Sequence, residues 1–155
     1  MRALACLVLI IALTGCLTSP DKCAAINPSN PATETYASSL NIDLSQMSKT
    51  VNGVYTQDVV VGTGATLSQP TNVQVYYVAY LPDGTVVDQQ LQKPFLFDLR
   101  TITAAGVLDG MLGMSVGGRR RMVVPSELAL GACGHGPIPP NSTLIYEIEL
   151  LEIDS

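Results

Sequence analysis

Apolar and polar residues alternate over three stretches of the chain, which is the period-2 pattern of half-buried β-strands. The first stretch places these residues on one face: Val73, Val75, Tyr77, Ala79 and Leu81. Pro82-Asp83-Gly84 follows as a turn, because Pro presets one backbone dihedral and Gly supplies a positive φ. The other two stretches are Phe95, Phe97 and Leu99, and then Leu144, Tyr146, Ile148 and Leu150. Glu147 and Glu149 would lie on the solvated face of the last strand.

Between these strands, residues 104–114 have helical spacing. Val107, Gly110, Met111 and Met114 fall at i, i+3, i+4 and i+7. Gly106, Gly110 and Gly113 each weaken an isolated helix by about 1 kcal/mol relative to Ala, so we interpret them as a sign of close packing on a sheet. The pattern predicts an α+β fold, an antiparallel sheet with one short helix on its concave face.

The N-terminus has the pattern of a secretory signal peptide over residues 1–15. Arg2 precedes an apolar run, residues 3–13, that is too short to span a bilayer, and small residues follow it. Leu13-Thr14-Gly15-Cys16 resembles a bacterial lipobox, in which the Cys thiol becomes lipid-modified. The alternative is ordinary secretion with a cysteine near the cleavage site by chance. A lipidated Cys16 would hold the mature chain on a membrane.

Residues 16–49 form a predicted flexible tether. The segment is rich in Ser, Thr, Asn, Pro and Ala, and its large apolar residues show no useful period. A partly helical stretch is expected only near residues 36–47. The folded domain is expected to span residues 50–155.

Composition excludes several classes of function. The chain has 8 basic and 13 acidic residues and no Trp. Because its basic residues form no stripe, the sequence predicts no nucleic-acid-binding surface. No metal site is predicted, because Cys23, Cys133 and the single His135 supply neither ligand number nor spacing. In an oxidising compartment Cys23 and Cys133 could form a disulfide, and two unpaired thiols are an equal alternative.

A series of short motifs, in order over about 100 residues, makes the fold prediction more specific. The motifs are VYYVAYL-PDG at 75–84, VD at 87–88, PFLF at 94–97, GVLDG at 106–110, MSVGGR at 114–119, VPSELA at 124–129, GACG at 131–134 and IPPNSTL at 138–144. From Val54 to Ile153 the chain resembles the FKBP-type peptidyl-prolyl cis-trans isomerases. That resemblance implies a bent five- or six-stranded antiparallel sheet wrapped around one short helix, which agrees with the pattern.

The resemblance also implies a pocket between helix and sheet that accepts a proline ring. Residues expected to carry the reaction are Tyr77, Asp88, Phe97, Ala104 (through its main chain) and Tyr146. Residues expected to contact the substrate around them are Phe95, Val87, Val107, Leu130 and Ile138. Without the resemblance, Tyr77 and Tyr146 would be ordinary core tyrosines and Asp88 a turn residue.

Rotation about a peptide bond has a barrier of about 18–20 kcal/mol, because twisting destroys amide resonance. No covalent bond breaks, so the reaction requires no cofactor, metal or nucleophile. An apolar pocket that removes water from the amide would favour the less polar twisted state. We therefore expect a peptidyl-prolyl isomerase, or rotamase, that acts on unfolded or flexible proline-containing polypeptides in the bacterial cell envelope. The expected protein is a monomer, lipid-anchored in the outer membrane and facing the periplasm, with macrolides as candidate pocket ligands.

Three positions depart from the family's usual aromatic residues: Val87, Val107 at the pocket floor, and Leu130. Each lost contact would cost about 1–3 kcal/mol of transition-state binding. The alternative function is therefore an FKBP-like chaperone or protein-binding lipoprotein with little or no isomerase activity.

Overall fold

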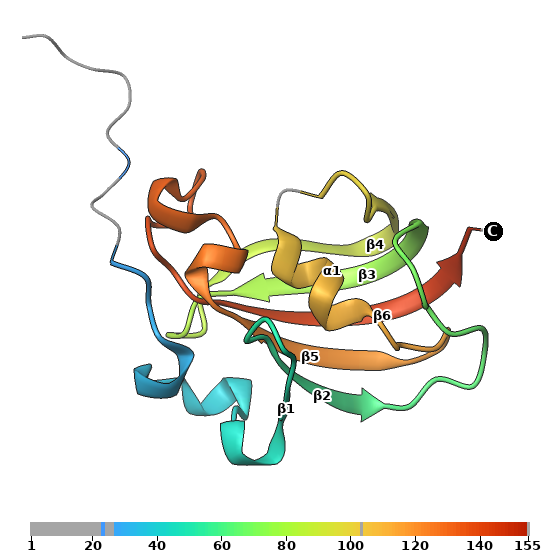
Figure 1. Cartoon of the computed structure of the whole chain (residues 1–155), viewed down its shortest axis with the longest axis horizontal. Helices are drawn as coiled ribbons and strands as arrows, with labels where there is room; N and C mark the ends of the chain where they lie inside the picture. Colours follow the sequence, from blue (N-terminus) through green and yellow to red (C-terminus); the bar gives the residue numbers. More distant parts are fainter. Residues whose placement is uncertain (1–22, 24–26, 103, 155) are drawn as a thin grey trace, which may run out of the picture.

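The computed structural model of the chain describes residue 23, residues 27–102 and residues 104–154. The predicted signal peptide and Cys16 lie outside these residues. A six-stranded antiparallel sheet curves around one short helix, which confirms the predicted fold class (Figure 1). The elements are β1 (Ser48–Lys49), β2 (Tyr55–Val60), β3 (Asn72–Tyr80), β4 (Val86–Asp98), α1 (Ala105–Met111), β5 (Arg119–Val124) and β6 (Leu144–Ile153).

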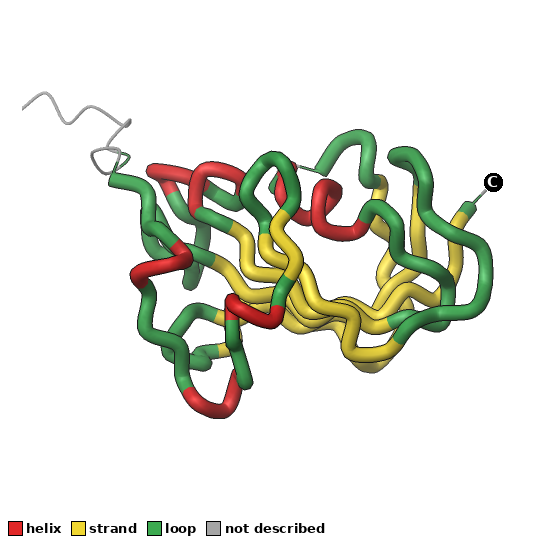
Figure 2. Tube along the Cα trace, turned by 60° about the horizontal axis from the view of Figure 1, so that its bottom comes forward, coloured by secondary structure: helices red, strands yellow, loops and turns green. Residues whose placement is uncertain are grey.

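The main core lies between α1 and the concave face of the sheet. Neighbouring strands follow the order β1-β2-β5-β6-β3-β4, so β6 and β3 lie inside the sheet and β4 forms one edge. The alternating residues predicted for β3 and β6 all face this core, where Val73, Ile148 and Leu150 are fully buried. Figure 2 shows the helix within the curve of the sheet. In the described part of the chain, no helix is long and apolar enough to span a bilayer.

Glycines bring α1 unusually close to the sheet. A Cβ added at Gly106 would clash with Val124 Cγ1, and one added at Gly110 would clash with the sulfur of Met122. Both contacts confirm that these two glycines serve close packing. The same interpretation is wrong for Gly113, which has a φ of +81° and no atom near its would-be Cβ. Gly113 instead permits the chain to leave the helix in a left-handed conformation.

Arg120 stabilises the C-terminal end of α1. Its Nη1 donates hydrogen bonds to the carbonyl oxygens of Gly110 at 2.9 Å and Leu112 at 3.1 Å, and its Nε pairs with Asp58 at 2.7 Å. A cation beside the last carbonyls of a helix offsets the negative end of its dipole. One largely buried guanidinium therefore links β5, β2 and the helix.

Residues 27–49, which we call the N-terminal segment, do not form the predicted free tether. Three short 3-10 turns, Pro31–Thr33, Ser38–Leu40 and Leu44–Gln46, lie against the domain on the convex face of the sheet. Leu40 is buried with Val123 and Ile145, and the Ala37 N–H donates to the Pro82 carbonyl at 2.8 Å. Isolated Leu and Tyr residues in a polar segment gave no periodic signal, although they are sufficient to cover a second small core.

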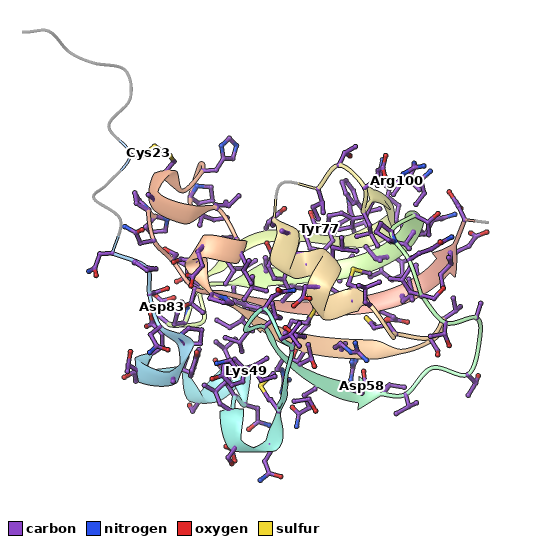
Figure 3. All side chains as sticks on the ribbon, in the orientation of Figure 1. Cys23, Lys49, Asp58, Tyr77, Asp83 and Arg100 are labelled. Atoms are coloured by element: carbon purple, nitrogen blue, oxygen red, sulfur yellow. A yellow bond between two sulfur atoms is a disulfide. The ribbon has the colours of Figure 1, made fainter. Side chains whose placement is uncertain are left out.

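A disulfide joins Cys23 to Cys133 and resolves the open alternative between paired and free thiols. Figure 3 shows Cys23 beside the loop that carries Cys133. The bond links residues 110 positions apart, so it ties the start of the described chain to the loop between β5 and β6.

The close approach of α1 can be tested with Gly106→Ala. The new methyl would meet the stiff side chain of Val124 and the backbone of Leu128, so we expect unfolding free energy to fall by about 1–3 kcal/mol. Urea denaturation measures this change, with Ala105→Ser at an exposed position of the same helix as the control. A Gly106→Ala protein as stable as the wild type would show that helix and sheet are not in close contact.

Candidate active-site pocket

A cavity of about 270 Å³ opens between α1 and the β3–β4 end of the sheet. Its lining is Tyr77, Asp88, Phe95, Phe97, Ile102, Ala104, Val107, Leu130 and Tyr146. Three larger hollows, of about 320, 360 and 390 Å³, border the N-terminal segment, but charged groups such as Glu34, Lys49 and Glu127 help to line them. The smaller cavity is the candidate site because aromatic and aliphatic side chains form most of its wall, as ligand pockets require.

Three aromatic rings form one wall of the pocket. The ring centroids of Tyr77 and Phe97 lie 5.4 Å apart, those of Tyr77 and Phe95 5.7 Å, and those of Phe95 and Phe97 5.0 Å. Phe95 and Phe97 are two positions apart on β4 and so share a face, while Tyr77 comes from the adjacent strand β3. Each pair is tilted or edge-to-face, the arrangement that aromatic quadrupoles favour.

Tyr77 and Asp88 are coupled by a hydrogen bond. The Tyr77 hydroxyl donates to Asp88 Oδ2 at 2.8 Å, and Asp88 is the only charged residue in the lining. Burial of the ring, and then the hydrogen bond to Asp88, raise the pKa of Tyr77 above its ordinary value. Tyr77 therefore stays a neutral donor, with its ring orientation held by the carboxylate at the pocket rim.

Ala79 creates the space between Asp88 and Tyr146. In the sheet register Ala79 pairs with Asp88 on one side and with Tyr146 on the other. A methyl group in the middle of this row leaves room above the sheet, whereas a larger residue would extend into it. Tyr146 itself is buried, and this burial, followed by the negative charge of Asp88, raises its pKa to about 12.

The opposite wall is aliphatic. Val107 is fully buried in α1 and forms the floor, and Leu130 closes the side next to the loop held by Cys133. Ala104 and Ile102 come from the connection between β4 and α1. The pocket thus has aromatic rings and one carboxylate on the sheet side, and only hydrocarbon side chains on the helix side.

The structure brings together eight of the ten predicted site residues. Val87 and Ile138 do not line the cavity, and both pack against the edge of the main core. The main chains of His135 and Ile138 are joined by two hydrogen bonds in a tight turn. Sequence reasoning missed Ile102, although an apolar residue between Thr101 and Thr103 in a polar connection was a usable signal.

Comparisons with known proteins agree with this geometry. A family model described as FKBP-type peptidyl-prolyl cis-trans isomerase matches residues 64–151. FK506-binding protein 4 of Dictyostelium discoideum is 38% identical over 102 residues, which are 64% of this chain and 28% of that protein. FK506-binding protein 4 of Neurospora crassa is 41% identical over 107 residues, 68% of this chain and 23% of that protein. The chain spans less than a third of the length of these curated relatives.

Two solved structures are similar over most of the described domain. A peptidyl-prolyl cis-trans isomerase from Pseudomonas syringae has a TM-score of 0.66 and 32% identity, covering 71% of this chain and 82% of that one. FkpA from Escherichia coli has a TM-score of 0.65 and 32% identity, covering 70% of this chain and 52% of that one.

The burial of Tyr146 predicts a specific loss of stability in alkali. The folded-state pKa of about 12 exceeds the ordinary 10.0, so the unfolded chain releases this proton at lower pH than the folded one. Stability is therefore retained below pH 10 and lost as pH rises toward 12, by up to about 2–3 kcal/mol. Urea denaturation at pH 8 and pH 11 should show a smaller loss for Tyr146→Phe than for the wild type. Equal losses in the two proteins would contradict a buried Tyr146 phenol.

Proposed function

Because the chain belongs to the FKBP-type peptidyl-prolyl cis-trans isomerase family, we propose that it accelerates rotation about Xaa-Pro bonds in exported polypeptides. The observation that carries the proposal is the pocket itself. A cavity with an aromatic wall, a hydrocarbon floor and one coupled Tyr–Asp pair has the size and character to receive a proline ring.

The proposed mechanism uses water removal rather than bond chemistry. A planar amide has a larger dipole than a twisted one, so transfer into an apolar site raises the energy of the planar state more than that of the twisted state. The proline ring would pack on Phe97, Tyr146 and Val107, next to the hydrogen-bonded Tyr77–Asp88 pair. Each apolar contact that strengthens as the bond twists lowers the rotation barrier.

Two polar groups have supporting roles in this proposal. Asp88 orients the Tyr77 hydroxyl and supplies a negative field without transferring a proton. The main-chain N–H of Ala104 would anchor a substrate carbonyl next to the proline, which fixes the chain on one side of the rotating bond. Rotation of the other side then requires no large movement of the protein.

A second function is supported by the same lining. Val107 and Leu130 are aliphatic where the family usually has aromatic residues, so the floor is less filled and one potential hydroxyl donor is missing. An FKBP-like chaperone or protein-binding module would retain polypeptide affinity with little or no isomerase activity. Turnover of a short peptide distinguishes these functions.

The decisive measurement is kcat/KM for a short Xaa-Pro peptide, using a soluble chain that begins at Leu17 and so retains both Cys23 and the N-terminal segment. Tyr77→Phe and Asp88→Ala should each lower kcat/KM by about tenfold, because they remove the coupled pair. Phe97→Ala should lower it at least as much, and the exposed Val61→Ser should leave it unchanged. A wild-type rate no greater than the uncatalysed rate would contradict the isomerase function and favour the binding module. Macrolide binding would then show whether the pocket is intact.

We also propose that the chain is exported and anchored through a lipid on Cys16, in the outer membrane and facing the periplasm. The disulfide at Cys23 gives this anchor a short reach, because only seven residue steps separate Cys16 from Cys23. A fully extended chain of that length covers at most about 25 Å. The domain would therefore lie close to the bilayer rather than at the end of a long tether.

Incorporation of a labelled fatty acid tests the anchor. In a bacterial host that processes lipoproteins, the full-length chain should take up labelled palmitate and fractionate with membranes. Cys16→Ala should take up no label, while Cys133→Ser should be labelled normally. Equal labelling of the Cys16→Ala variant would exclude this lipidation site.

A further inference from the structure

The pocket opens next to an unusual concentration of exposed apolar residues on β4. Four large hydrophobic side chains of this strand are exposed: Val86 at 46%, Leu91 at 52%, Phe95 at 39% and Leu96 at 57%. β4 is the last strand of the sheet, so its outer edge pairs with no strand in the described part of the chain. Monomeric proteins usually protect such an edge with charges, prolines or β-bulges. Residues 89–94 include Lys93 and Pro94, whereas residues 95–97 contain neither a charge nor a proline.

A bulge divides β4 into two parts. Tyr77 pairs with Gln90 and Val75 with Phe95, so the four residues 91–94 stand opposite the single residue Tyr76. Pro94, which has no N–H, prevents regular pairing through the bulge. The section 95–98 beyond it pairs regularly with residues 72–75 of β3 and presents a short, regular outer edge.

Side chains of this section flank the free edge on both faces of the sheet. Phe95 and Phe97 line the pocket on the concave face, and Leu96, between them, lies on the convex face. A strand added alongside would lie about 4.8 Å from β4, and its alternate side chains would contact Phe95 on one face and Leu96 on the other. Edge addition of this kind joins main-chain hydrogen bonds to alternating side-chain contacts.

We propose that the outer edge of residues 95–98, together with Leu91, binds an extended, alternately apolar segment of the same polypeptide whose proline occupies the pocket. Phe95 belongs to both surfaces, so a chain leaving the pocket reaches the edge within about three or four residues. Residues 95–97 carry no charge, and Asp98 at their C-terminal end is already paired with Arg100, so the edge fits an uncharged, strand-forming segment such as an unfolded protein exposes. This inference rests on the proposed isomerase function and adds a substrate class to it. The preferred substrates would be polypeptides in which an apolar, strand-forming segment precedes or follows the proline.

The test compares short and extended peptides on wild-type and variant proteins. The short peptide contains one Xaa-Pro bond. The extended peptides add Val-Thr-Val-Thr-Val to one or the other end, and matched controls add Ser-Thr-Ser-Thr-Ser. For at least one end, we expect the apolar extension to raise kcat/KM about five- to tenfold over its polar control. Leu91→Glu combined with Leu96→Glu should remove that gain and leave the short peptide unaffected, because neither residue lines the pocket.

Val61→Glu is the matched control variant. Val61 is 76% exposed and follows β2, which lies toward the other edge of the sheet from β4. The same charge at Val61 should therefore leave the gain in kcat/KM from the apolar extension intact. Equal rates for apolar and polar extensions, or a gain that persists in the Leu91/Leu96 variant, would overturn the proposal.

If no peptide is turned over, the isomerase function fails. Docking is then decided by fluorescence anisotropy of the labelled extended peptides, where equal affinities for wild type and variant would overturn it.

Discussion

The close contact between α1 and the sheet is the constraint on which the rest of this structure depends. Gly106 and Gly110 allow the helix to approach Val124 and Met122 without intervening side chains. This approach sets the height of Val107 above the sheet and therefore the depth of the pocket. Arg120 completes the arrangement, since its guanidinium holds the C-terminal carbonyls of a helix that has only seven residues. A short, glycine-containing helix would not be stable alone, so tertiary contacts maintain it.

The sheet side and the helix side of the pocket differ in chemical character. Tyr77, Phe95, Phe97 and Tyr146 come from three neighbouring strands, with Tyr146 opposite Ala79 and with Phe95 and Phe97 opposite Val75 and Val73. Against them stand Val107 and Leu130, which contribute volume but neither aromatic surface nor a hydrogen-bond donor. The stabilisation of a twisted amide would then depend mainly on the sheet side and on the Tyr77–Asp88 hydrogen bond.

The N-terminal segment changes the relation between the domain and the rest of the chain. Its short turns cover the convex face through Leu40, and Arg121 bridges Glu147 and the Asn41 carbonyl there. The disulfide at Cys133 holds the same end of the chain near the loop that follows Leu130. One wall of the pocket and the chain that leads toward the N-terminus are thus mechanically connected, although they are far apart in sequence.

The amino-acid sequence by itself determined which faces are buried and in which order the elements occur. A period of two at residues 73–81 and 144–150, and a helical period at residues 107–114, follow directly from the geometry of strands and helices, and the motif order identified the family. Only the tertiary structure decided the rest, because it depends on distances between residues remote in sequence. Ile102 enters the pocket and Val87 and Ile138 do not, since loop paths and a β-bulge leave no periodic signal. Likewise, the disulfide between Cys23 and Cys133 forms on a loop of the folded domain, and Leu40 is buried because the convex face of the sheet presents Val123 and Ile145 to it.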